Sequence, residues 1–288
     1  MNIRYFCTVL TQGWKNGTIP GRKKKLTGGV FVAWRSLVLL CLSLWVPVEA
    51  MAAPVPVINV PRGDCEHPQP NTDLRHCSFA GKHIRGLDLS GSLLNGVDFS
   101  NARLPDCNLS RASLKQADFK WTQLTNCSIL GADFLEAELF HTVFDGSTLD
   151  GSRFVGADMF GANLIEVQAR GVNFQDAYMK DIIMEEGDFN HSSFIGCFMQ
   201  RVVLIESNLK GSFFHDAVLT GAALEGANFD GATITHSLVN GAALEGASFR
   251  GADLHNSRFV NARGTADFSG ARNIPVHLQA ILDKKASR

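Results

Sequence analysis

The chain has 288 residues, enough for one or two domains, and a formal net charge of −1. The charge is uneven, because residues 1–53 hold seven basic residues and one acid, which leaves 20 basic and 27 acidic residues in 54–288. A body with a net charge of −7 argues against nonspecific nucleic-acid binding, which needs many Lys and Arg side chains to replace phosphate counterions.

Residues 1–53 have the composition of an export leader. Four consecutive basic residues, 22–25, precede an apolar stretch that is richest over 36–47, and small residues then offer cleavage after Ala50 or Ala52. This order is typical of a secretory signal peptide and predicts a periplasmic or extracellular protein.

Three alternatives to a cleaved secretory signal stay open. The leader is long enough to be a bipartite organelle presequence, which would deliver the protein to a thylakoid lumen, or it is a retained anchor and then the only membrane contact. Initiation at Met51 would instead give a cytoplasmic protein without a leader.

Residues 54–71 are rich in proline and predict an extended linker or N-terminal cap rather than a domain. Cys65 and Cys77 flank the start of the regular pattern that follows. An exported protein would meet an oxidising environment, so these two residues are a candidate disulfide.

A five-residue period then governs the chain. Every fifth residue from Leu74 to Phe259 is apolar, without exception over 38 positions, and 35 of the residues two places earlier are Ala, Ser, Thr, Gly, Cys or Val. A helix brings together residues three and four apart, and a strand alternates with a period of two, so neither explains the pattern. A chain that turns one corner per five residues does, with the central apolar residue and the small residue pointing inward.

The repeat resembles the pentapeptide-repeat family, whose consensus is A-[DN]-L-x-x. Segments 132–134 (Ala-Asp-Phe), 162–164 (Ala-Asn-Leu) and 252–254 (Ala-Asp-Leu) match it directly, and no insertion interrupts the period. The resemblance implies an all-β fold, a right-handed quadrilateral β-helix with four repeats per coil and about nine coils. It says little about function, because a fold does not carry its function with it.

The ends of such a solenoid need caps. The regular body is expected over 72–271, with the register weakening at Gly264 and Phe268 off phase. Residues 272–288 predict a short capping helix, in which Asn273 caps the first turn and Leu278 faces the last coil with Ile281 and Leu282.

Four repeats per coil imply that residues 20 apart lie one above the other. One outward surface is then apolar over several coils, and we call it the apolar stripe: Trp121, Phe140, Phe160, Tyr178, Phe198, Val218 and Leu238. A contiguous exposed apolar patch usually marks an interaction site, which predicts a protein partner or self-association. Burial under the linker is the alternative.

The next face carries three stacked acids, Glu166, Glu186 and Glu206, which we call the acidic column. We expect it to contact a basic partner segment. A divalent cation, or a solvated face that only aids solubility, would explain the same pattern.

No catalytic residue and no metal or cofactor site is predicted. The sequence has no HExxH, paired CxxC, nucleophile elbow or phosphate-binding glycine loop. His215 and His255 share a column two coils apart and His236 stands in another, so no stacked histidine pair in adjacent coils is expected. Cys107 and Cys127 stack inside the core, where free thiols are favoured over a disulfide or metal pair.

The sequence therefore predicts a non-enzymatic, exported binding scaffold. The main alternative is a mimic of DNA, because some members of the family protect gyrase in this way and residues 131–245 contain 17 acids against five bases. The predicted export signal and the apolar stripe both argue against a DNA mimic. A structural protein of the periplasm or thylakoid lumen is the third hypothesis.

Overall fold

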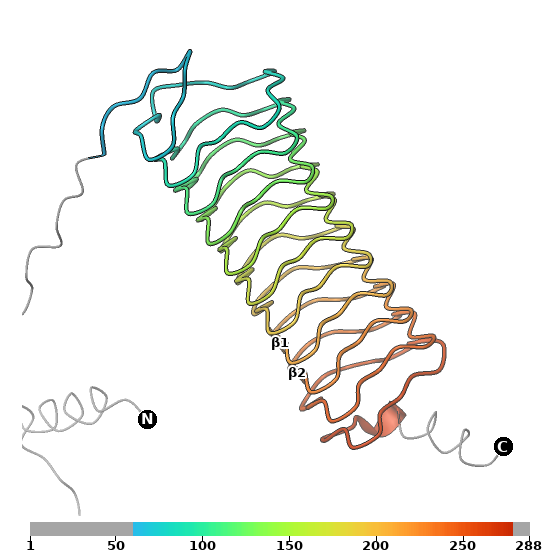
Figure 1. Ribbon diagram of the computed structural model, residues 1–288. Coiled ribbons are helices and arrows are strands. Elements are labelled where there is room, and N and C mark those ends of the chain that lie inside the picture. The colour runs from blue at the N-terminus through green and yellow to red at the C-terminus, as the bar shows by residue number, and fades with distance from the viewer. Residues whose placement is uncertain (1–59, 279–288) are drawn as a thin grey trace, which may run out of the picture. The chain divides into compact units, whose positions relative to one another are not determined.

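Each five-residue repeat forms one side of a coil. The computed structural model describes residues 60–278, and in them the residue before each central apolar residue bridges in parallel to the residue 20 places on, as in Asn108–Ser128 and Ser128–Thr148. Coils of four repeats therefore stack along one axis (Figure 1). The leader 1–53 and the first residues of the predicted linker lie outside the described residues.

On one side of the solenoid, two successive coils form three-residue strands. Strand β1 (Phe213–His215) pairs in parallel with β2 (Thr233–Thr235), with Phe214 opposite Ile234 and His215 opposite Thr235. The strands lie on successive coils toward the C-terminal end (Figure 1). Among the described residues, no helix is long and apolar enough to cross a membrane.

Left-handed backbone makes the corners. The residue two places after each central apolar residue has a positive φ, for example 59° at Trp121 and 55° at Glu166. Its N–H donates to a carbonyl of the following coil, as from Trp121 to Phe140 at 2.9 Å. The corner thus continues the inter-coil hydrogen bonding, and its side chain projects from an edge of the solenoid.

Stacked rings fill the core. Phe134, Phe154, Phe174, Phe194 and Phe214 are fully buried, and their successive ring centroids are 4.7, 5.3, 5.1 and 4.7 Å apart with nearly parallel planes. One hydrophobic cluster runs from Leu74 to Leu278. The central apolar residues therefore form one continuous interior rather than separate cores.

The inward small residues do more than leave room. The buried hydroxyl of Ser147 donates to the Leu124 carbonyl at 2.6 Å and accepts the N–H of Cys127 at 2.8 Å. Where the residue 20 places on is alanine, as Ala157 is for Ala137, the N–H instead closes its own turn, from Ala137 to the Phe134 carbonyl at 3.0 Å. Serine and threonine thus link adjacent coils through polar groups that would otherwise face an apolar interior.

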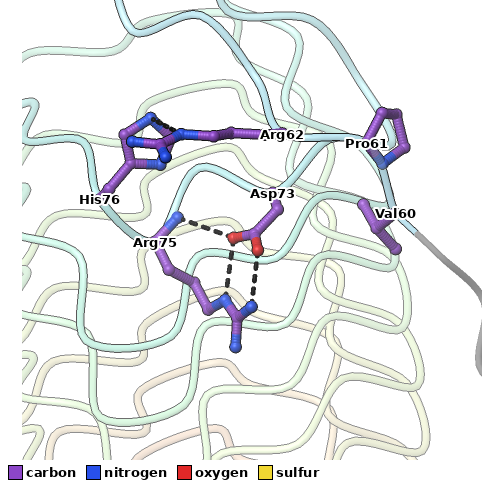
Figure 2. Close-up of a pocket in the computed structure, with 6 residues that line it drawn as sticks. All are labelled: Val60, Pro61, Arg62, Asp73, Arg75 and His76. Carbon is purple, nitrogen blue, oxygen red and sulfur yellow. Dashed lines mark hydrogen bonds and ion pairs between the residues drawn. The ribbon is translucent and has the colours of Figure 1, made fainter.

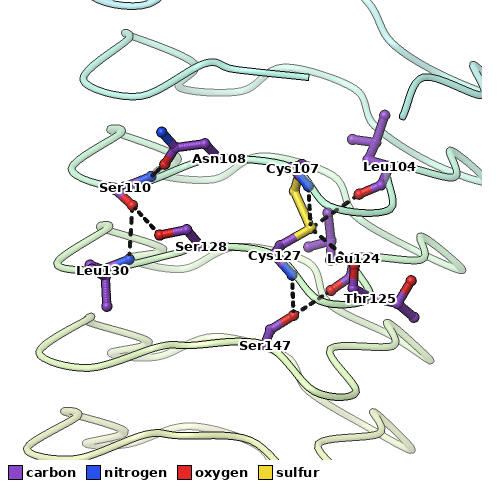
Figure 3. Close-up of a disulfide and its surroundings, with 10 residues drawn as sticks. All are labelled: Leu104, Cys107, Asn108, Ser110, Leu124, Thr125, Cys127, Ser128, Leu130 and Ser147. Atoms are coloured by element: carbon purple, nitrogen blue, oxygen red, sulfur yellow. Dashed lines mark hydrogen bonds between the residues drawn. A yellow bond between two sulfur atoms is a disulfide. The ribbon is translucent and has the colours of Figure 1, made fainter. Parts of the chain in front are cut away.

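Two disulfides cross-link the N-terminal half. Cys65 and Cys77 are joined with their Cα atoms 5.5 Å apart, which ties the entering chain to the first coil. Cys107 and Cys127 are also joined, with Cα atoms 4.6 Å apart (Figure 3). The expectation of two free thiols there is wrong, because adjacent coils bring stacked Cα atoms within the range that a disulfide spans. Cys197 is free and buried.

The two ends of the solenoid depart from the regular 20-residue coil. At the N-terminus, Gly63 donates to the Asp73 carbonyl and Asp73 donates to the Pro61 carbonyl, so this segment runs along the first coil as a short extra strand. At the C-terminus the spacing shortens to 19 residues, as in Ser248–Asp267, and this shift returns Phe268 to the core.

The described part of the predicted capping helix is one turn, 276–278, in which Leu278 is buried against the core cluster. Ile281 and Leu282 lie outside the described residues.

We expect Ser147→Ala to lower the free energy of unfolding by about 1 kcal/mol, measured by guanidinium unfolding followed by circular dichroism. The loss is limited because the freed Cys127 N–H and Leu124 carbonyl can pair as they do at Ala137. Ser193→Ala is the control, since that side chain faces outward and is only half-buried. Equal losses in the two variants would contradict a structural role for the inward hydroxyl.

We also expect disulfide mapping without reduction to recover Cys65 linked to Cys77 and Cys107 linked to Cys127. Cys197 should resist iodoacetamide in the folded protein, because burial raises the pKa of its thiol to about 12, and should react in denaturant. Alkylation of Cys107 or Cys127 in denaturant before reduction would contradict the second disulfide.

Candidate protein-binding surface

The structure brings the aromatic members of the apolar stripe into one ladder. Trp121 meets Phe140 edge-on at 5.4 Å, and Phe140 stacks on Phe160 at 5.3 Å. The ladder continues from Phe160 to Tyr178 at 6.2 Å and from Tyr178 to Phe198 at 5.5 Å. Parallel bridges then join Phe198 to Val218 and Val218 to Leu238, so all seven predicted residues are contiguous.

Ring stacking decides which part of each aromatic side chain meets the solvent. Trp121 is 54% exposed and Tyr178 39%, whereas the other five members of the stripe are half-buried. Because most ring faces are covered by neighbouring rings, the stripe presents mainly ring edges and aliphatic carbon. Such a surface suits a flat apolar protein face better than a ligand that must stack on an open ring, such as a sugar or a nucleobase.

The end of the ladder is fixed by His141, whose ring stacks on the indole of Trp121 at 4.4 Å. The His141 ring also lies over Gly161, where a Cβ atom would come within 2.5 Å of the imidazole. The sequence pattern gives no reason for glycine at 161. A side chain there would displace the imidazole that holds the exposed indole.

The acidic column lies along a corner of the neighbouring face. Glu166, Glu186 and Glu206 are all exposed, and each occupies the corner position with φ of 55–56°. Between the acidic column and the apolar stripe, Ile183 bridges to Val203, and both are half-buried. The two predicted surfaces are therefore joined by further apolar contact area on the intervening face.

Asp145 extends the negative corner by one coil and was missed in the sequence. Burial raises the pKa of its carboxyl above the usual range, and repulsion from Glu166 adds to the effect, although a hydrogen bond from the Ile165 N–H at 3.2 Å opposes it. The signal for it was present, since Asp145 precedes the glutamates in the adjacent corner column. Within residues 60–278, no basic side chain forms an ion pair with Glu166, Glu186 or Glu206.

A cavity of about 630 Å³ lies at the N-terminal end, lined by Val60, Pro61, Arg62, Asp73, Arg75 and His76 (Figure 2). The Arg75 guanidinium donates two hydrogen bonds to Asp73, at 2.8 and 2.6 Å, and holds the pKa of that carboxyl at about 2. Arg62 approaches His76, with Nε and Nε2 3.4 Å apart. These charged groups pair mainly with one another, so we assign no chemistry to the cavity.

A possible metal constellation adjoins this cavity. Ligand atoms of Cys65, His76 and Cys77 lie within 4.8 Å of one another. The two sulfur atoms are joined in the disulfide, which leaves neither as a thiolate for a metal. In the disulfide-bonded protein this group therefore acts as a covalent clip on the first coil.

The expectation that no two histidines pair in adjacent coils is wrong. The rings of His215 and His236 lie 5.0 Å apart on adjacent coils, and those of His236 and His255 lie 5.6 Å apart. Each column, read separately, has no adjacent pair. The contacts arise because the two corner residues of a repeat form neighbouring columns, so a histidine in one column reaches a histidine in the other.

We expect Asp145→Asn to raise the melting temperature at neutral pH. The folded-state pKa of Asp145 lies above the unfolded value of 3.8, so the free energy of unfolding falls as the pH rises through this interval and stays lower above it. The increase in melting temperature should therefore be present at about pH 7 and vanish near pH 3, where the wild-type carboxyl is protonated and as neutral as the amide that replaces it.

Asp150→Asn is a control with the opposite sign, because Asp150 pairs with Arg170 at 2.5 Å and its loss should lower stability slightly. A pH-independent effect of Asp145→Asn would contradict the electrostatic explanation.

Comparison with models of known protein families supports the five-residue repeat. The model of the pentapeptide repeat region matches residues 85–154, and the model of eight pentapeptide repeats matches 137–176, 184–221, 199–235 and 227–263. No curated protein sequence matches the chain.

Among solved structures, the chain is similar to HetL, a pentapeptide repeat protein involved in heterocyst differentiation regulation in the cyanobacterium Nostoc sp. strain PCC 7120. The identity is 24%, the match covers 67% of this chain and 90% of HetL, and the TM-score is 0.53. QnrB1, a plasmid-mediated fluoroquinolone resistance protein, is 18% identical over 72% of this chain and 98% of its own, with a TM-score of 0.35.

A pentapeptide repeat protein from the Arabidopsis thaliana thylakoid lumen is 25% identical, over 46% of this chain and 74% of its own, with a TM-score of 0.25. The uninterrupted five-residue period, the 20-residue bridge spacing and the family matches together show that the chain belongs to the pentapeptide-repeat family.

Proposed function

We propose that the protein is a non-enzymatic, exported scaffold that binds a protein partner or a second copy of itself through the apolar stripe and the acidic column. One observation carries the proposal: the stripe is continuous over six coil spacings, from the coil of Trp121 to that of Leu238. At the usual strand spacing this is a length of about 29 Å. An apolar surface of this extent is uncommon on a protein without a partner.

The rigidity of the surface supports binding without rearrangement. Each stripe residue sits on backbone that is hydrogen-bonded to the next coil, for example Tyr178 N–H to the Ala157 carbonyl at 2.9 Å and Met179 N–H to the Phe198 carbonyl at 2.8 Å. Side chains already stacked on one another lose little conformational freedom when a partner covers them. The stripe is thus preorganised, and binding energy is not spent on ordering it.

The acidic column supports a partner with basic residues at the edge of an apolar contact. Its three carboxylates repeat at about 5 Å spacing and project from a corner. Complementary charge at the rim of an interface contributes mainly to the association rate and to discrimination between partners. The apolar stripe would then supply most of the affinity and the acidic column the orientation.

The expected architecture belongs to the same proposal. We infer a right-handed solenoid of about nine coils over 72–271, a linker or cap at 54–71, a capping helix at 272–288 and a cleavable leader at 1–53. The internal register of the described coils and the burial of Leu278 support the body and its C-terminal cap. Sequencing the N-terminus of the native protein from fractionated cells tests the leader, and a cytoplasmic form beginning at Met51 would overturn export.

A triple variant tests the binding surface. We expect Phe160→Ser, Tyr178→Ser and Phe198→Ser together to weaken self-association or partner capture at least tenfold, because the centre of the apolar contact is lost. Light scattering coupled to size exclusion reports self-association, and crosslinking followed by affinity capture reports a partner. Leu130→Ser is the matched control, since Leu130 is an exposed apolar residue (43%) that lies off the stripe.

Glu186→Gln with Glu206→Gln tests the charged part of the surface. The two glutamate substitutions together should weaken binding at low salt and have a much smaller effect at high salt, where exposed charges are screened.

Binding that survives the triple serine variant would overturn the proposal, and equal losses with Leu130→Ser would show that the stripe has no special role.

A further inference from the structure

Three histidines form a ladder along one corner near the C-terminal end of the solenoid. His215 ends β1, Thr235 ends β2 in register with it, and His255 follows one coil later in the same column. His236 occupies the neighbouring corner column on the middle coil, and its ring contacts both of the other rings, at 5.0 and 5.6 Å. All three histidines are exposed, and we call them the histidine ladder.

The ring spacing fits a shared metal ion. A tetrahedral Zn²⁺ holds imidazole nitrogens at 2.0–2.1 Å, which places the centroids of two bound rings about 5 Å apart. Both contacts that His236 makes are close to this separation, and the planes are inclined at 68° and 72° rather than stacked face to face. His215 and His255 stand on either side, about 10 Å apart at the backbone, so each can turn its ring toward an ion bound by His236.

The surrounding side chains are those that orient metal-binding imidazoles. His215 Nε2 lies 3.3 Å from a carboxylate oxygen of Asp216, and its Nδ1 lies 2.9 Å from the Thr235 hydroxyl. His236 Nε2 lies 3.1 Å from the Asn256 amide nitrogen. A carboxylate hydrogen-bonded to a ligating histidine increases its basicity and fixes its ring. Asp216 also places a negative charge in the same corner column as His236.

A second carboxylate lies beside the ladder. Asp253 accepts a hydrogen bond from the N–H of His255 at 3.1 Å. The Arg272 guanidinium lies 3.8 Å from a carboxylate oxygen of Asp253 and pairs with its charge. Asp216 therefore supplies the negative charge that favours a cation at the ladder, and the imidazole nitrogens favour a transition metal over Mg²⁺ or Ca²⁺, which prefer oxygen.

We propose that the histidine ladder is a surface site for Zn²⁺ or a similar divalent transition metal, with His236 as the shared ligand and His215 and His255 as the flanking ligands. Solvent water completes the coordination of the ion. The site is independent of the apolar stripe, because its ligands come from a different corner. It requires no change in the backbone, but the exposed rings must rotate and His215 must exchange one of its two hydrogen-bond partners, Asp216 or the Thr235 hydroxyl, for the ion.

Zinc titration of the full chain, purified with its disulfides intact and without an affinity tag, tests the site. Isothermal calorimetry at about pH 7.5 should show saturable binding of Zn²⁺, and none of Mg²⁺ at the same concentrations. His236→Gln should weaken zinc binding at least tenfold, and His215→Gln and His255→Gln should each weaken it less.

Two matched variants keep the test specific. His191→Gln removes a corner histidine elsewhere on the solenoid, and His76→Gln removes the histidine beside the Cys65–Cys77 disulfide. Both should bind zinc as the wild type does. Circular dichroism establishes that each variant is folded, and imidazole resonances in ¹⁵N NMR spectra identify the ligating rings. Absence of saturable zinc binding, or unchanged binding by folded His236→Gln, would overturn the proposal.

Discussion

The structure depends on one constraint, which is that each coil repeats the backbone of the coil before it after 20 residues. Inter-coil hydrogen bonds impose this register at every side and every corner, from Asp73 to Ser248. Because the bonds are local to each pair of coils, a single insertion would rotate all following side chains relative to those before it. The uninterrupted period of the sequence is therefore a requirement of any surface that spans several coils. The apolar stripe, the acidic column and the histidine ladder all depend on it.

The fold and the positions of the surface residues could be predicted because a side chain's direction follows from its place in the repeat. Tyr178, Phe198, Val218 and Leu238 share one column in the sequence and one set of bridges in the structure. What the sequence could not provide was contact between columns. The pairing of His215 with His236 and the contact of Trp121 with Phe140 both join positions that are not 20 residues apart.

Other differences arose from assigning a residue by its usual behaviour rather than by the local distance. Cys107 and Cys127 were expected as free thiols because buried cysteines usually are, yet stacked Cα atoms only 4.6 Å apart allow a disulfide. Phe268 is off phase, as expected, yet the last coil is one residue shorter, so its ring still stacks on that of Phe249 at 5.0 Å. In both cases the contact depends on the distance between stacked coils, which the five-residue period alone does not give.

The left-handed corners constrain which side chains stay exposed. A left-handed residue other than glycine costs about 1 kcal/mol or more, so a bulky or charged corner residue needs a compensating contact or role. Many corner side chains fold over a glycine on the next coil, as His141 does over Gly161 and Asp176 over Gly196. Glu166 and Glu186 have no such glycine above them, because the next corner residue is another glutamate, and the same holds for His236 below Asn256. These three side chains stay exposed, as do the other members of the acidic column and the histidine ladder, where we propose that a partner and an ion bind.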